Sequence, residues 1–84
     1  MTRQRTLKTR LQAVYVVLNE NRHIRTELFA FAQQVEALKF AHTLAGTHVQ
    51  DPADVQSQVV QGVLLWLKYS REGDHVSVHE VAVR

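Results

Sequence analysis

Hydrophobic residues in the middle of the chain recur at helical spacing. Alternating steps of four and three residues separate Ile24, Leu28, Phe31, Val35, Leu38 and His42. A hydrophobic period of about 3.5 residues, sustained over several turns, is typical of a helix that packs lengthwise against another helix. The pattern predicts one long helix over about residues 22–45, which Gly46 ends by adopting a positive φ. We expect this stripe to be the contact between two copies of the chain.

The regions on either side of this long helix also contain helical signals. Residues 4–19 carry helically spaced leucine and valine side chains, at Leu7, Leu11, Val14 and Leu18. Within that region, residues 13–18 are rich in β-branched and aromatic side chains and fit a buried strand as well. After the long helix, Asp51 and Pro52 form a helix-start signal. We expect a third helix from there to about Arg71.

The C-terminal segment has the two-residue alternation of a strand. Valines at 76 and 78 alternate with polar residues at 75, 77 and 79. The alternation slips at Val81 and Val83, which suggests a bulge or an end that is buried on both faces. The segment therefore predicts a strand over residues 75–83.

These elements predict a mainly α domain spanning residues 1–84, with three helices, a long central one, and a C-terminal strand. A lone strand must find a partner for its backbone N–H and C=O groups. The same strand of a second copy would supply one, giving a homodimer, and this is the arrangement we expect. The alternative partner is residues 13–18, which would give an α+β domain with β-α-α-β order.

Cysteine is absent from the chain, which excludes disulfides, thiolate metal sites and a cysteine nucleophile. The longest apolar runs are six and five residues, far short of the roughly 20 that a membrane-spanning helix needs. We therefore expect a cytoplasmic protein.

Catalytic motifs are also missing from the sequence. The serines lack a G-x-S-x-G frame and the glycines are isolated. His79 and Glu80 begin like the zinc motif H-E-x-x-H, but Val83 stands where the second histidine is required. On a strand, His75 and His79 would lie about 13 Å apart, too far to share an ion. We expect no enzymatic activity, no cofactor and no bound metal.

Positive charge is concentrated at the start of the chain. Residues 1–25 contain six Lys and Arg against one acid, whereas residues 26–84 contain four against seven. Residues 1–5 are interpreted as a flexible basic arm. The arm and its continuation could contact nucleic-acid phosphates through Arg3, Arg5, Lys8 and Arg10. A DNA- or RNA-associated regulator is therefore the alternative function, although the interleaved aromatic residues of single-strand binders are missing.

Two aromatic residues on the predicted long helix suggest a protein contact. Phe29 and Phe40 lie eleven residues apart, so on a helix they project in nearly the same direction, among polar neighbours. Leu65 falls on the polar side of the predicted third helix. Large apolar side chains in a polar setting are typical of a binding surface. The sequence thus predicts a small non-catalytic regulator, inhibitor or adaptor that binds a protein partner through Phe29, Phe40 and Leu65 and acts as a homodimer.

Overall fold

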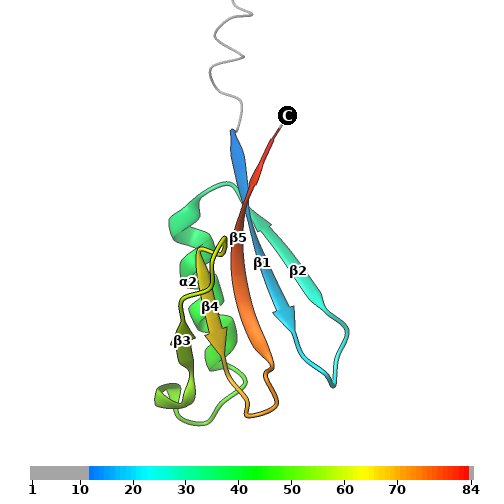
Figure 1. Cartoon of the computed structure of the whole chain (residues 1–84), viewed down its shortest axis with the longest axis vertical. Coiled ribbons are helices and arrows are strands. Elements are labelled where there is room, and N and C mark those ends of the chain that lie inside the picture. Colours follow the sequence, from blue (N-terminus) through cyan, green and yellow to red (C-terminus); the bar gives the residue numbers. More distant parts are fainter. Residues whose placement is uncertain (1–11, 84) are drawn as a thin grey trace, which may run out of the picture.

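The computed structural model describes residues 12–83, and within them one five-stranded antiparallel sheet carries a single α-helix on one face (Figure 1). The elements in chain order are β1 (Ala13–Glu20), β2 (Glu27–Phe31), α2 (Gln34–Gly46), the 3₁₀ turn η1 (Pro52–Asp54), β3 (Gln56–Gln58), β4 (Leu65–Lys68) and β5 (His75–Ala82). The strands lie in the order β2-β1-β5-β4-β3. The fold is therefore α+β with one helix, and the predicted mainly α architecture with three helices is wrong.

The two longest strands, β1 and β5, form the centre of the sheet. Their antiparallel register runs without interruption from Ala13 opposite Ala82 to Glu20 opposite His75. Residues 13–18 are therefore a strand and not the end of a helix, because their β-branched side chains suit a pleated sheet. The C-terminal strand pairs with this segment of its own chain. The order of elements is nevertheless not β-α-α-β, because β2, β3 and β4 are strands as well.

The slip in the alternation of β5 reflects a change in which face is apolar. Val76 and Val78 point to the face beneath α2 and are fully buried. Val81 lies on the opposite face, where it stands across from Val14 of β1. The strand carries no bulge, since its register with β1 is unbroken.

The predicted long central helix is divided between three kinds of structure. Ile24 lies in the turn before β2, Leu28 lies in β2, and the helix α2 begins only at Gln34. The heptad spacing therefore arises where a turn, a strand and a helix follow one another. The true signal in this region is the two-residue alternation within β2, where Phe29 and Phe31 face α2 and Leu28 faces away.

The predicted third helix stops after one turn. The start signal is correct, since the Asp51 side chain accepts a hydrogen bond from the Ala53 N–H at 3.0 Å and Pro52 is the first helical residue. Beyond Asp54 the chain forms the strands β3 and β4, joined by a turn in which Gly62 takes φ +82°. Valines at 55, 59, 60 and 63 disfavour continuation of the helix, because β-branched side chains lose rotamer freedom there.

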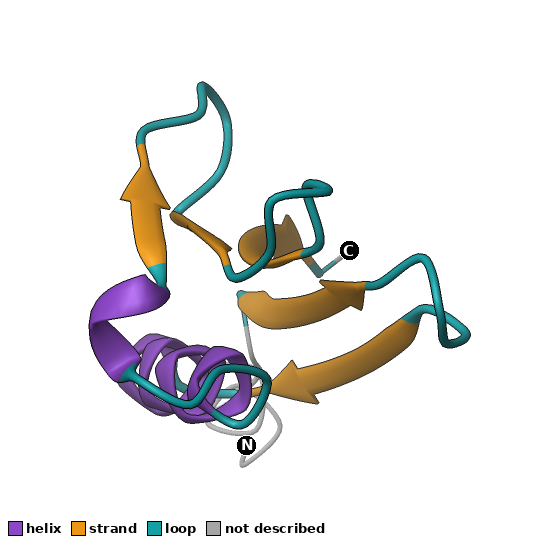
Figure 2. Ribbon diagram, turned by 90° about the horizontal axis from the view of Figure 1, so that it is seen from below, coloured by secondary structure: helices purple, strands orange, loops and turns teal. Residues whose placement is uncertain are grey.

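The core lies between α2 and the sheet, and Figure 2 shows the helix beside the strands in a view from one end. Three alanines one turn apart, Ala37, Ala41 and Ala45, are fully buried on the helix. Their small side chains let α2 approach the sheet closely. The strands meet them with a covered face, defined by Val17, Asn19, Leu67, Tyr69, Val76 and Val78. No helix among residues 12–83 has the length and apolar character needed to cross a bilayer.

Alternate residues of the same strands form a second face that no described helix covers. We call it the open face, and it comprises Val14, Val16, Leu18, Leu28, Trp66, His75, Ser77, His79 and Val81. Ser77 is buried among its neighbours, while most of the others are half-buried.

Candidate functional site

A polar cluster around two buried residues, Asn19 and Tyr69, lies at one end of the covered face. The Tyr69 hydroxyl donates to Asn19 Oδ1 at 2.6 Å, and Asn19 Nδ2 donates to Glu27 Oε1 at 2.9 Å. Asn21 Nδ2 donates to the Tyr69 hydroxyl at 2.9 Å, and the exposed ring of His48 stacks on the Tyr69 ring at 4.3 Å. Burial raises the pKa of Tyr69 above 10.0, so the hydroxyl remains a proton donor at neutral pH. The cluster therefore holds Tyr69 in one orientation.

Asp74 joins two loops beside this cluster. It accepts a hydrogen bond from the Arg22 backbone N–H at 2.9 Å and another from Ser70 Oγ at 2.9 Å. The bond from the Arg22 N–H is the main reason that the pKa of Asp74 lies below 3.8. Asp74 thus ties the β1–β2 loop to the β4–β5 loop as a buried carboxylate.

A group of potential metal ligands surrounds the same carboxylate. Ligand atoms of His23, Glu72 and Asp74 lie within 4.8 Å of one another. His23 Nε2 is 3.2 Å from Glu72 Oε1, and the Arg22 guanidinium is 4.0 Å from the same oxygen. Because a cation already stands beside Glu72 and both Asp74 oxygens accept hydrogen bonds, we interpret the group as a loop-fastening network. The absence of a bound metal stays a prediction.

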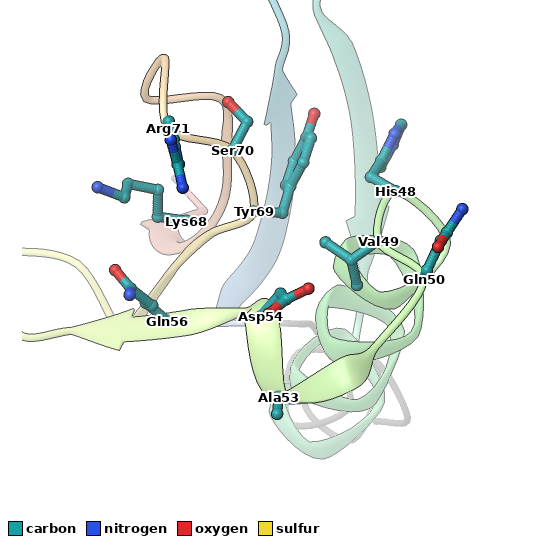
Figure 3. Close-up of a pocket in the computed structure, with 10 residues that line it drawn as sticks. All are labelled: His48, Val49, Gln50, Ala53, Asp54, Gln56, Lys68, Tyr69, Ser70 and Arg71. Atoms are coloured by element: carbon teal, nitrogen blue, oxygen red, sulfur yellow. The ribbon is translucent and has the colours of Figure 1, made fainter.

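A polar hollow adjoins the cluster at the β3–β4 side of the molecule (Figure 3). It has a volume of about 630 Å³ and opens between the α2–η1 loop, η1 and the end of β4. Figure 3 shows Gln56, Lys68 and Arg71 on one side, His48 and Gln50 on the other, and Tyr69 between them. Hydrogen-bonding side chains therefore line most of its wall. Sequence reasoning missed this hollow, because its lining comes from three segments without a shared motif.

The histidines of the open face make contacts that hold them in place. The His75 ring stacks on the Trp66 ring at 4.4 Å, and His75 Nε2 is 3.6 Å from Glu20 Oε2. Ser77 Oγ is 2.9 Å from His79 Nε2. A serine beside a histidine is part of many hydrolase sites, but Ser77 is buried in the middle of a strand. We interpret the pair as structural.

The three residues predicted to bind a protein partner are half-buried and pack against the core. Phe29 of β2 and Phe40 of α2 contact each other with ring centroids 4.7 Å apart, and Phe31 lies 5.2 Å from Phe40. Leu65 of β4 is half-buried and packs against the core. The premise that Phe29 and Phe40 share one face of one helix is wrong, because Phe29 lies in β2 and Phe40 in α2. A partner contact through Phe29, Phe40 and Leu65 stays a prediction.

The six residues of the predicted dimer stripe are also divided. Phe31 and Leu38 pack against the core, and His42 lies exposed on α2. The other three remain exposed around β2, with exposed fractions of 45% for Ile24, 63% for Leu28 and 61% for Val35. No continuous helical stripe forms among these residues, because Ile24 precedes β2, Leu28 lies in β2 and Val35 lies in the first turn of α2.

The basic residues predicted to contact nucleic acid, Arg3, Arg5, Lys8 and Arg10, lie outside the described residues. Within residues 12–83 there are five Lys and Arg against eight Asp and Glu, a formal net charge of −3. A nucleic-acid function thus stays a prediction that depends on residues 1–11.

Comparisons with protein-family models, with curated proteins and with solved structures found no match. The function has to be inferred from this chain's own geometry.

Proposed function

We propose that the protein is a small non-catalytic protein-binding module, of the regulator or adaptor type, that forms a homodimer through strand β2. The observation that carries the proposal is an apolar edge strand that has no neighbouring strand on its outer side among residues 12–83. Figure 1 shows β2 at the margin of the sheet, and the strand order places it there. The lack of cysteine is consistent with action in the cytoplasm.

An unpaired edge strand presents backbone groups that can pair with another chain, and most proteins protect such edges. Shortness, lysines, prolines and bulges are the usual protection. Strand β2 is five residues long, Glu27–Phe31, pairs with β1 without a bulge, and contains neither Lys nor Pro. The opposite edge differs, since β3 has only three residues, Gln56–Gln58, and all of them are polar and exposed. The edge at β2 is therefore the one suited to association.

A second copy of β2 can pair with this edge in antiparallel fashion, with a two-fold axis at the central residue Phe29. The charged first residue of each strand then lies opposite the apolar last residue of the other. In that register Glu27 stands across from Phe31 of the second copy, so the two carboxylates are kept apart. Leu28, which is 63% exposed, stands across from Ala30 of the second copy, so the contact covers an exposed apolar side chain on each strand. The two five-stranded sheets would then form one continuous sheet.

The test replaces an exposed leucine on the edge strand with a charged residue. Leu28→Lys puts a lysine beside the proposed two-fold axis and should raise the dimer dissociation constant at least about tenfold, which is about 1.4 kcal/mol. The matched control is Val59→Lys, in the β3–β4 loop, where Val59 is 103% exposed. Analytical ultracentrifugation over a wide concentration range measures both, and circular dichroism checks that each variant folds.

The proposal fails if the unaltered protein remains monomeric at the highest concentration, or if the two lysine variants weaken the dimer equally. The first result would leave the edge unpartnered. The second would show that added positive charge, rather than the β2 edge, governs association.

A further inference from the structure

The hollow beside Tyr69 has properties that the association through β2 does not use. It lies against β4 and the turn η1, on the side of the sheet away from β2. Its volume of about 630 Å³ falls within the range of about 300–1,000 Å³ that small-molecule sites occupy. A dimer joined at β2 would leave this hollow open to solvent.

The charges around the hollow favour an anion. Lys68 and Arg71 both line it, and the ion pairs of residues 12–83 involve Arg22, His23 and His75 instead. Neither Lys68 nor Arg71 therefore has a carboxylate within 4.0 Å in the described part of the chain. Asp54 is the acidic residue in the lining. Two cations against one acid leave a net positive wall.

Two residues of the wall, Tyr69 and Ser70, are also held in place before any ligand arrives. Tyr69, which stands between the two sides, is fixed by its 2.6 Å bond to Asn19, and the His48 ring stacks on it. Ser70, which precedes Arg71, donates to the buried Asp74. A site whose backbone is already ordered loses little conformational entropy on binding.

We propose that this hollow binds a small phosphorylated molecule, with Lys68 and Arg71 holding the phosphate and Gln50 and Gln56 contacting the organic part. A guanidinium offers two parallel N–H donors to an oxyanion, and an ammonium adds a second positive charge. A phosphate monoester carries close to two negative charges, which matches the two cations. Glutamine side chains can both donate and accept hydrogen bonds. In Figure 3 Gln56 lies on the same side of the hollow as the two cations, and Gln50 lies on the opposite side.

The test is a titration of the full chain with adenosine monophosphate, followed by amide chemical shifts in nuclear magnetic resonance spectra. Saturable shifts are expected in residues 48–56 and 68–71, with a dissociation constant of about 0.1–1 mM. Lys68→Gln and Arg71→Gln should each weaken binding at least about fivefold, a loss typical of removing one charge-assisted contact. Lys39→Gln is the matched control, because the substitution removes the same positive charge from an exposed position on α2, away from the hollow.

Inorganic phosphate and succinate, titrated at the same ionic strength, distinguish the possible ligands. Weaker binding of both than of adenosine monophosphate supports the proposal. Equal binding of inorganic phosphate would overturn the role of the organic part, and equal binding of succinate would overturn the preference for phosphate. No saturation by about 10 mM, or an equal loss in Lys39→Gln, would overturn the site itself. Leu28→Lys should bind adenosine monophosphate unchanged, so the result is independent of dimer formation.

Discussion

The covered face and the open face of the sheet are built from alternate residues of the same strands, yet within residues 12–83 only the covered face has a helix packed on it. Val17 and Val78 on the covered face are fully buried against the alanines of α2. Val16, the neighbour of Val17, is half-buried on the open face, where Trp66 and His75 stack on each other. The comparison shows that a strand's alternation assigns residues to two faces, whereas the position of a single helix decides which face becomes the core.

The largest difference between the faces should appear when a leucine is shortened. Leu67→Ala on the covered face should lower the free energy of unfolding by about 3 kcal/mol, because it opens a cavity beneath α2. Leu64→Ala, at a position 41% exposed just before β4, should cost less than about 1 kcal/mol. Urea denaturation measures both. Equal losses would mean that Leu64, outside the covered face, is packed as tightly as Leu67.

A smaller difference is expected for the polar groups of the two faces. Asn19 is fully buried and bonded to Tyr69 and Glu27, so Asn19→Ala should cost about 2 kcal/mol by leaving the Tyr69 hydroxyl without its acceptor. Ser77→Ala removes a contact with the half-buried His79, which water can replace, and should cost less than about 1 kcal/mol. Urea denaturation measures the free energy of unfolding of both variants. A larger loss for Ser77→Ala than for Asn19→Ala would mean that the polar contact on the open face stabilises the fold more than the one on the covered face.

The smallest effect concerns pH at the polar end of the covered face. Because the pKa of Asp74 is lowered in the folded protein, chiefly by the Arg22 N–H bond, its stabilising contribution is present above 3.8 and is lost as pH falls through the lower, folded-state pKa. Asp74→Asn should therefore be less sensitive to acid than the unaltered protein between about pH 5 and pH 2. Thermal unfolding followed across this range measures the difference.

The control for this experiment is Asp54→Asn, which removes an exposed carboxylate from η1. It should leave the acid dependence unchanged. If Asp54→Asn flattened the pH dependence as much as Asp74→Asn, the effect would come from overall charge and not from the bonds to Asp74.

Local signals in the sequence were reliable where neighbouring residues alone decide the structure. The alternation of residues 75–79 correctly predicted a strand, because successive side chains of a strand point to opposite faces. Asp51 with Pro52 correctly predicted a helical start, because the capping bond joins residues two positions apart. The spacing of Ile24, Leu28 and Phe31 wrongly predicted a helix, because steps of three and four residues also occur by chance where a turn leads into a strand. The candidate sites were predicted poorly for a related reason, as the hollow and the β2 edge each depend on strand order.

What the sequence by itself determined was therefore which residues suit a strand, a turn or a helix cap. Only the tertiary structure decided that residues 13–18 pair with residues some sixty positions later, that Phe29 meets Phe40, and that β2 is left at an edge. The reason is physical. Local preferences amount to about 1 kcal/mol or less per residue, whereas the burial of side chains distant in sequence is gained only when the whole sheet closes against α2.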